Sequence, residues 1–257
     1  MRESKVLAKW NSGQAARFAS MGHVLPFFIS HAAHNNYDGI WLDLEHRNMD
    51  DREVQHLLAL GHLYDIDMMV RPPTTMRGKL YRYLEDGAAG FMIPFVSSAE
   101  IAREIVSSVK FPPVGNRGLD GAGLDCNFGI DSWREGSTYI QDSIDNTFIV
   151  AQIETPEAVL NATEIAAVQG IDLIFLGPGD LQLRLDADPS IDMTIESATE
   201  IIKAAADQNG IHWGRTAGSV ADLDRFHKMG AKMIPWGGDF ALAKMLEQTS
   251  KELDSTL

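Results

Sequence analysis

Two carboxylates stand at points where short apolar runs of the chain stop abruptly. Glu154 ends the run 150–153, and Asp180 follows the run 173–176 after a Gly-Pro-Gly turn. Such β-branched and aliphatic runs are typical of strands buried on both faces of a parallel sheet, and neighbouring strands would bring the two acids side by side. Two hard oxygen ligands beside Gln152 indicate a divalent-metal site, with the other positions left to water or substrate. The alternative is that each acid only caps the helix that follows it.

A histidine and an arginine also follow strand-like runs. His46 comes just after Asp43 and Glu45, and these acids would hold its tautomer and raise its basicity. Arg71 stands before two prolines and has no helical face to lie on, so its guanidinium can hold a carboxylate or a developing oxyanion. For Arg71 the alternative is a salt bridge to a neighbouring loop. A structural role is expected for the histidines in helical or turn contexts, which are His23, His31, His34, His56, His62 and His227.

Other catalytic devices have no obvious carrier in this chain. The lone cysteine, Cys126, has no partner for an internal disulfide, no Cys/His cluster has zinc spacing, and we interpret Cys126 as incidental rather than nucleophilic. No Ser/His/Asp order and no phosphate-binding P-loop stands out. Lys79, Lys110 and Lys203 lie in helical stretches or at their ends, so a Schiff-base mechanism has no lysine at a strand end.

The elements that must position these residues alternate along the chain. Strands are predicted at 15–20, 39–43, 68–71, 91–94, 148–153, 173–176, 211–214 and 231–235. Helices are predicted at 26–36, 51–64, 77–86, 98–110, 156–167, 194–209, 220–229 and from 240 onward, after a short leading helix within 1–13. Asp50 is the expected N-cap of one helix, and Gly87 is the C-cap signal of another.

Eight strands, each followed by a helix, predict an α/β fold of the (β/α)8 TIM-barrel type, with residues 1–257 as a single domain. The residues proposed for chemistry directly follow strands, which places them on the carboxyl-end rim where such barrels keep active sites. A doubly wound open sheet is the main alternative, but it would carry a Gly-rich phosphate turn after the first strand, and 20–23 is not one. Residues 111–146 hold two prolines and many glycines without periodicity, and they are predicted to form a long excursion over the active-site rim.

Composition disfavours several classes of partner. The formal net charge of −14 argues against a broad basic surface for nucleic acid or anionic lipid, and an anionic substrate would need local arginines. No run approaches the roughly 18 apolar residues of a membrane span, and the N-terminal residues lack the apolar core of a signal peptide. The expectation is a cytoplasmic protein that binds neither nucleic acid nor membrane.

Five ordered motifs resemble the HpcH/HpaI family of class II pyruvate aldolases, which includes 4-hydroxy-2-oxoheptanedioate aldolase and 2-dehydro-3-deoxyglucarate aldolase. The motifs are Trp41–His46, Val70–Pro73, Phe111–Gly118, Gln152–Thr155 and Gly177–Leu181, and the resemblance spans roughly residues 35–245. It implies a (β/α)8 barrel and a hexameric homo-oligomer built from pairs of subunits that exchange the last helix. It also implies Mg²⁺ or Mn²⁺ at the rim, with Co²⁺ as a further option, and no organic cofactor.

The activity implied by the resemblance is a reversible aldol cleavage. A 4-hydroxy-2-oxo acid would give pyruvate and an aldehyde through a pyruvate enolate that the metal stabilises. By motif, the implied site residues are Glu154 and Asp180 as metal ligands, Gln152, Gly179 and Asp180 around pyruvate, Arg71 at its keto oxygen, and His46 as the base. The partners are therefore a small 2-oxo acid and an aldehyde.

One departure from the family pattern concerns the partner of the histidine. The family pairs this histidine with an aspartate fourteen residues beyond the arginine. Here Glu85 stands at that position and Asp86 follows it, and the extra methylene of a glutamate changes its reach. Glu85 is the expected catalytic partner of His46, with Asp86 as the alternative.

Two further departures bear on the aldehyde rather than on pyruvate. Residues 74–76 read Thr-Thr-Met where the family usually has Trp-Asn-Asp, and 213–218 contain Arg215 where apolar or small residues are usual. Because the metal and pyruvate motifs are intact, we expect these changes to alter the aldehyde partner. We hypothesise that Arg215 or Arg117 favours an aldehyde with an anionic or polar end.

Two other classes of function stay open. A CoA-thioester lyase of the citrate lyase β or malyl-CoA lyase type would use a similar barrel, but it needs a basic patch for nucleotide phosphates, which the acidic composition disfavours. A non-catalytic barrel serving as a scaffold or binding protein is the second alternative, and the intact carboxylate pair argues against it. The predicted function is therefore a metal-dependent aldehyde-lyase.

Overall fold

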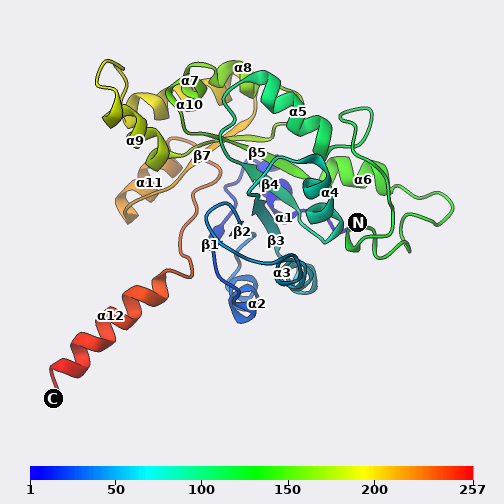
Figure 1. Cartoon of the computed structure of the whole chain (residues 1–257), viewed down its shortest axis with the longest axis horizontal. Coiled ribbons are helices and arrows are strands. Elements are labelled where there is room, and N and C mark those ends of the chain that lie inside the picture. Colours follow the sequence, from blue (N-terminus) through cyan, green and yellow to red (C-terminus); the bar gives the residue numbers. More distant parts are fainter. Residues whose placement is uncertain (257) are drawn as a thin grey trace.

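The computed structural model describes residues 1–256, which fold around one parallel sheet (Figure 1). Its strands, within those residues, are β1 (Phe18–Met21), β2 (Gly39–Asp43), β3 (Asp67–Arg71), β4 (Gly90–Ile93), β5 (Phe148–Ile153), β6 (Leu173–Leu176) and β7 (His212–Arg215). They lie in the curled sheet in sequence order, and all neighbouring pairs are parallel. The predicted strands at 39–43, 148–153 and 173–176 have the observed bounds, and four others are offset by a few residues. The predicted α/β class is confirmed.

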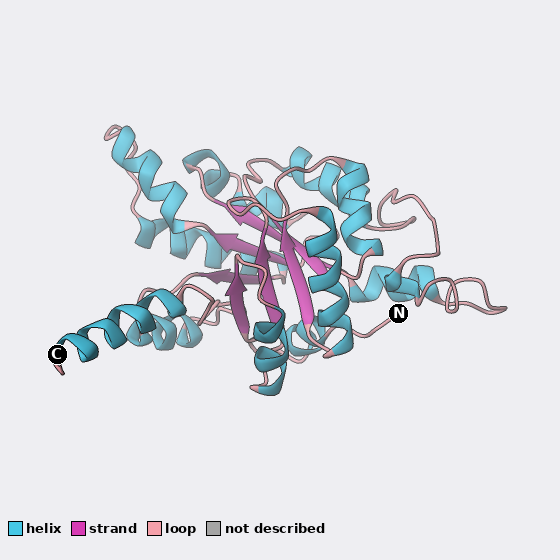
Figure 2. Cartoon of the chain, turned by 60° about the horizontal axis from the view of Figure 1, so that its bottom comes forward, coloured by secondary structure: helices cyan, strands magenta, loops and turns pink. Residues whose placement is uncertain are grey.

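Helices follow the strands and cover the outside of the sheet (Figure 2). They are α1 (Lys5–Asn11), α2 (Pro26–His34), α3 (Asp51–Leu63), α4 (Arg77–Glu85), α5 (Ala99–Val109), α6 (Tyr139–Asn146), α7 (Pro156–Leu160), α8 (Ala162–Ala166), α9 (Pro178–Ala187), α10 (Ile195–Asn209), α11 (Val220–Lys228) and α12 (Ala241–Asp254). The predicted cap Asp50 forms a reciprocal capping box with Glu53, and Gly87 follows α4 with φ of +108°. The helix predicted at 156–167 is divided into α7 and α8, and the sequence did not reveal α6 or α9.

Two apolar layers lie on the two faces of the sheet. Successive side chains of a strand point to opposite faces, so Trp41 and Val150 pack inside the curl together with Phe175. Their neighbours Leu42 and Ile149 pack outward against the helices. The inner layer ends at α1, which lies across the amino ends of the strands and joins that layer through its apolar face. This leaves the carboxyl ends of the strands to polar residues.

The segment 231–238 lies between β7 and β1 without forming a regular strand. Met233 makes isolated parallel bridges to both Ala16 and Gly214, and backbone hydrogen bonds continue to Phe18. A Cβ at Gly214 would lie 2.3 Å from the carbonyl oxygen of Met233, so glycine permits this close approach. The regular strand predicted at 231–235 was wrong, because Pro235 lacks the N–H that a continuous ladder requires.

Residues 111–146 connect α5 to β5 and contain α6 and a 3-10 turn at Leu124–Cys126. A helix-to-strand connection returns to the amino ends of the strands, and there the amine of Met1 lies 3.2 Å from Asp131. Figure 1 shows α6 beside the N-terminus. The expected cover over the active-site rim is therefore not formed by this segment within its own chain.

The C-terminal helix α12 projects away from the rest of the chain (Figures 1 and 2). None of its described residues is buried, and its apolar side chains are exposed, namely Leu242, Met245, Leu246 and Leu253. Across the described chain, no helix has both the length and the apolar character needed to cross a membrane.

Candidate functional site

Glu154 follows the last residue of β5 and is almost fully buried. One of its carboxylate oxygens accepts a hydrogen bond from the backbone N–H of Phe95 at 2.9 Å, and the other accepts one from the side-chain amide of Gln152. Phe95 has φ of +53°, a backbone conformation that is uncommon for a bulky residue. In this conformation its backbone N–H donates to Glu154. The amide oxygen of Gln152 is buried and has no hydrogen-bond partner among residues 1–256.

The second acid comes to the same end of the sheet through β6. Ile153 and Leu176 are paired across β5 and β6, so Glu154 lies opposite Gly177. A Cβ at Gly177 would lie 2.7 Å from a carboxylate oxygen of Glu154, so a glycine is required for the turn to pass this close. Asp180 follows in the first turn of α9, which begins at this turn.

Glu154 and Asp180 share one electrostatic environment. Burial raises the pKa of Glu154, the charges of Asp180 and Glu45 raise it further, and hydrogen bonds from Phe95 and Gln152 oppose these effects only in part. Burial also raises the pKa of Glu45, against the influence of nearby positive groups. The structure thus brings together the two predicted metal ligands and adds a third carboxylate to their surroundings.

The donor set at this place fits a hard divalent cation in its chemistry. Glu154 and Asp180 offer carboxylate oxygens, and the unpartnered amide oxygen of Gln152 is a further oxygen donor beside Glu154. Within the residues described, no group of three or more His, Cys, Asp or Glu side chains is arranged to hold a metal. The remaining ligand positions would therefore fall to water or to the substrate.

Arg184 links the first turns of α9 to the loop after β4. It donates to a carboxylate oxygen of Asp180 at 3.0 Å, and its guanidinium lies 5.1 Å from the ring centre of Phe95. Gly179 has no atom within 4 Å of the position of a Cβ, so its backbone borders open space, as a backbone contact to substrate would need. Neither Arg184 nor Phe95 was predicted from the sequence. The i, i+4 spacing of Asp180 and Arg184 was a usable signal only once α9 was recognised as a helix.

Arg71 is the last residue of β3 and is held by two acids from the loop after β2. Its guanidinium lies 2.8 Å from Asp43 and 3.2 Å from Glu45, and it covers the ring of Trp41 at 4.8 Å from the ring centre. Burial would raise the pKa of Asp43, but hydrogen bonds and the charge of Arg71 lower it below its ordinary value. The ion pair considered as the alternative for Arg71 is therefore present, and it fixes the guanidinium at the rim.

His46 lies at the mouth with 53% of its side chain exposed. Its Nε2 is 3.5 Å from a carboxylate oxygen of Glu45, whereas Asp43 accepts the backbone N–H groups of Glu45 and His46. Of the two acids expected to orient the imidazole, Glu45 is thus the one beside the ring. This arrangement leaves His46 open to a ligand and next to a proton acceptor.

A profile of the HpcH/HpaI aldolase/citrate lyase family matches residues 23–244. The matched span is most of the chain and includes Glu154, Asp180, Arg71 and His46. The chain belongs to this family. A 2-keto-3-deoxy-L-rhamnonate aldolase from Klebsiella pneumoniae subsp. pneumoniae is 32% identical over 214 residues, which are 81% of this chain and 74% of the relative. A 2-dehydro-3,6-dideoxy-6-sulfogluconate aldolase from Pseudomonas putida is 33% identical over 83% of this chain and 80% of its own length.

Solved structures agree with this assignment. An HpcH/HpaI aldolase from Desulfitobacterium hafniense DCB-2 has a TM-score of 0.86 at 31% identity, covering 97% of this chain and 96% of that chain. A citrate lyase β subunit from Mycobacterium tuberculosis shares the fold at a TM-score of 0.55 and 15% identity, covering 90% of this chain and 92% of its own. The predicted family and the predicted class II aldolase function are confirmed. The alternative of a CoA-thioester lyase corresponds to the citrate lyase β subunit, whose similarity to this chain is lower than that of the aldolases.

Within one chain, neither arginine proposed for the aldehyde end reaches the mouth of the aldolase. Arg117 is buried at the amino ends of the strands, where it pairs with Asp125 at 2.8 Å. Arg215 points outward from β7, donates to Thr199 at 2.6 Å and covers the ring of Phe226 at 4.2 Å. Strand alternation explains the direction of Arg215, because the side chain next to an inward-facing residue points to the helices.

Glu85 and Asp86 lie at the end of α4, on the opposite side of the aldolase from His46. The backbone of Glu85 borders Gly123, and burial raises its pKa while the charge of Arg117 opposes this shift. Asp86 accepts a hydrogen bond from Gln55 at 2.6 Å. No interaction among the residues described joins either acid to His46. Within one chain, neither alternative for the histidine's partner is in place.

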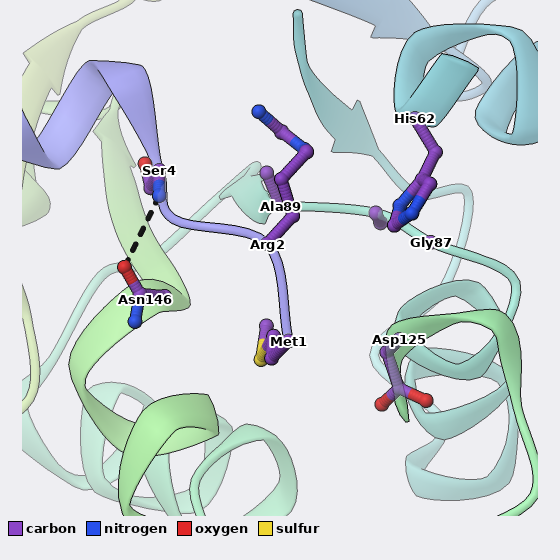
Figure 3. A pocket seen from close by; sticks show the side chains of 9 residues that line it. Met1, Arg2, Ser4, His62, Gly87, Ala89, Asp125 and Asn146 are labelled. Atoms are coloured by element: carbon purple, nitrogen blue, oxygen red, sulfur yellow. Dashed lines mark hydrogen bonds between the residues drawn. The ribbon is translucent and has the colours of Figure 1, made fainter. Parts of the chain in front are cut away.

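A pocket at the amino ends of the strands contains none of the predicted site residues (Figure 3). Met1, Arg2, His62 and Asp125 are among its lining residues. Its charged groups are already paired, since Arg2 binds Asp65 and Asp67 and Asp125 binds Arg117. This pocket is explained by the docking of the N-terminal segment, and Glu154, Asp180, Arg71 and His46 lie at the other end of the sheet.

Proposed function

We propose that this aldolase reversibly cleaves a 4-hydroxy-2-oxo acid into pyruvate and an aldehyde. The observation that carries the proposal is the electrostatically coupled pair Glu154 and Asp180 at the ends of neighbouring strands, with Arg71 held near the same rim. A 2-oxo acid carries a carboxylate and a keto oxygen on adjacent carbons, a pattern that a cation and an arginine can bind together. Two relatives are named for 2-keto and 2-dehydro acids, which agrees with this substrate class.

The cation in this proposal is Mg²⁺ or Mn²⁺, with Co²⁺ as a further option, and no organic cofactor is needed. Glu154 and Asp180 would hold it. When bound, such a cation supplies positive charge against the negative charge that develops on the 2-oxo acid. The backbone at Gly179, which borders open space, and the second amide N–H of Gln152, whose nitrogen already donates to Glu154, would orient the substrate carboxylate.

Arg71 and His46 would carry the remaining steps. Arg71 is fixed by Asp43 and Glu45, so its guanidinium can donate to the keto oxygen with little reorganisation. His46 would accept the proton of the 4-hydroxyl as the C3–C4 bond breaks and the aldehyde forms. The electron pair of that bond stays on the pyruvate fragment, and a proton then restores the methyl group.

The assembly we propose is a closed (β/α)8 barrel in a homo-oligomer, with α12 exchanged between subunits of a hexamer. The bridges of Met233 to both edges of the sheet support closure, and the exposed apolar side chains of α12 support a partner for this helix. If Glu85 acts on His46, as the family pattern implies, the pair has to form between subunits. A monomeric mass in light scattering would contradict the assembly.

The test is exchange of the methyl protons of pyruvate in D₂O, which needs no aldehyde. We expect exchange with Mg²⁺ or Mn²⁺, loss with EDTA and recovery when the cation is returned. Glu154→Gln and Asp180→Asn should abolish exchange. Arg103→Leu, which changes an exposed ion pair on α5, is the matched control and should exchange as wild type does. Exchange that persists in EDTA or in both site variants would overturn the proposal.

A further inference from the structure

A second polar cluster lies at the carboxyl ends of the strands, outside the residues assigned above. Nδ1 of His23 lies 2.8 Å from a carboxylate oxygen of Asp239, and the same oxygen accepts the backbone N–H of Gly22 at 2.8 Å. Asp239 is buried, whereas 53% of the His23 side chain is exposed. The buried carboxylate therefore fixes the imidazole through Nδ1 and leaves Nε2 facing away from it.

Arg47 lies against the same cluster. Its side chain passes over Gly22, where a Cβ would lie 3.0 Å from its Cγ. Its guanidinium is 5.0 Å from the ring centre of Phe240, and the imidazole of His23 packs against that ring at 5.2 Å. The ion pairs of residues 1–256 leave Arg47 without a carboxylate, and its guanidinium donates to the backbone carbonyl of His46 instead.

This cluster borders the proposed site. Met21 is paired with Leu42 across β1 and β2, so His23 leaves β1 at the level at which the loop carrying His46 leaves β2. Arg47 directly follows His46, the proposed base. The carboxylate pair that would hold the cation lies further along the curled sheet, after β5 and β6. The cluster is thus close to the residue that handles the aldehyde hydroxyl and apart from the pyruvate end.

We infer that Arg47 and His23 form the subsite for a negatively charged terminal group of the aldehyde fragment. The inference rests on the proposed aldolase function and specifies its substrate class. A guanidinium can hold a carboxylate or sulfonate through two parallel hydrogen bonds. When both of its ring nitrogens carry protons, the imidazole of His23 donates to Asp239 through Nδ1 and presents Nε2 as a third donor to the anion. In a chain with a net charge of −14, an anionic substrate needs such a local concentration of positive charge.

The test compares two aldehydes of equal length in condensation with pyruvate, succinic semialdehyde with a carboxylate and butanal without one. The measured quantity is the ratio of kcat/KM for the two. Arg47→Leu should lower this ratio by about 10-fold or more, because a hydrogen bond to a charged group contributes about 1.5–3 kcal/mol. His23→Asn keeps a donor for Asp239 but removes Nε2, and it should lower the ratio in the same direction. Arg103→Leu removes an equal charge on α5 and should leave the ratio unchanged.

The outcomes are distinct. A ratio that falls in both cluster variants and not in the control supports the subsite. An unchanged ratio, or an equal loss of kcat/KM for both aldehydes, overturns it, because damage to the fold would not discriminate by charge. Proton exchange into pyruvate, measured with the wild-type enzyme, tests the aldolase function separately. If the wild type exchanges pyruvate protons but the cluster variants keep its ratio of kcat/KM for the two aldehydes, the subsite is refuted and the aldolase function is not.

Discussion

Two buried carboxylates at opposite ends of the sheet are held in different ways. Asp67, at the amino ends, pairs with Arg2 and accepts hydrogen bonds from Ser4 at 2.6 Å and from the backbone of Val6 at 2.9 Å. Glu154, at the carboxyl ends, is held by a backbone N–H and an amide, with no arginine or lysine paired to it among the residues described. The amino end satisfies its charge within the chain, and the carboxyl end leaves its charge for a ligand.

This difference separates residues that stabilise the fold from residues that do chemistry. Negative charges that are buried together disfavour the folded state, and a ligand cation that binds only the folded protein compensates this cost. Ion pairs at the amino ends need no ligand. Substitutions at that end should therefore lower stability without a specific effect on catalysis, and substitutions at the rim should impair catalysis without lowering stability.

The largest effect is expected at the amino end, for Arg117→Met. Arg117 and Asp125 are both buried, and Tyr139 donates to the same carboxylate at 2.7 Å. Removing the guanidinium leaves a buried carboxylate without its cation, which costs about 3–5 kcal/mol. We expect that loss in the free energy of unfolding, measured by urea denaturation.

The double variant Arg117→Met/Asp125→Leu is the control for this prediction. Replacing both charges by apolar groups removes the unpaired carboxylate, so the double variant should be more stable than the single one. Arg103→Leu, at an exposed pair, should change stability by less than about 1 kcal/mol. A double variant less stable than Arg117→Met would show that the pair is not the reason for the loss.

The sheet was largely predictable from the sequence, because strands buried on both faces appear as apolar runs. β2 and β5 have the bounds that these runs gave. Helix α9 was missed because Gly-Pro-Gly resembles a turn, although proline is favoured in the first turn of a helix and here stands at its start. Helix α6 was missed because the surrounding segment has no sustained periodicity.

Site residues at strand ends were predictable from the sequence. Residues whose position depends on the course of a helix were not. Glu154 and Asp180 follow adjacent strands, so counting along the chain was enough to bring them together. Glu85 was assigned by its separation from Arg71 in the sequence, following the family pattern. The nine residues of α4, however, lead away from the rim, and a helix of that length spans about 13 Å. Arg184 contacts Asp180 because both lie on helix α9, and α9 was not predicted from the sequence.

A smaller effect is expected at the rim, for Arg71→Lys. Lysine keeps the charge but cannot reproduce the paired contacts to Asp43 and Glu45 or the stacking on Trp41. Losing one hydrogen bond to a charged group, about 1.5–3 kcal/mol, would lower kcat/KM for aldol cleavage by about 10–150-fold. Arg17→Lys changes an exposed arginine at the amino end and should leave kcat/KM unchanged. Equal losses in both variants would remove the distinction between the two ends.

The smallest effect is a gain in stability for Glu154→Gln, measured as Tm in EDTA so that no divalent cation compensates the carboxylate. Burial and the charge of Asp180 raise the pKa of Glu154 above the ordinary value of 4.5, so its ionised form disfavours folding above that raised pKa. The new amide can also donate to the unpartnered oxygen of Gln152 once the Gln152 amide turns over, since its nitrogen is the atom that faces residue 154 in the wild type. Tm should rise at pH 7.5 by about 2–4 °C for each kcal/mol recovered.

The pH dependence of this gain decides whether the raised pKa is its cause. As the pH falls through the raised pKa toward 4.5, Glu154 becomes protonated in the folded wild type and its penalty disappears. The Tm values of wild type and Glu154→Gln should therefore converge in acid. A gain that stays constant with pH would reflect packing instead, and a wild type that is the more stable protein at pH 7.5 would mean that Glu154 is as well compensated as Asp67.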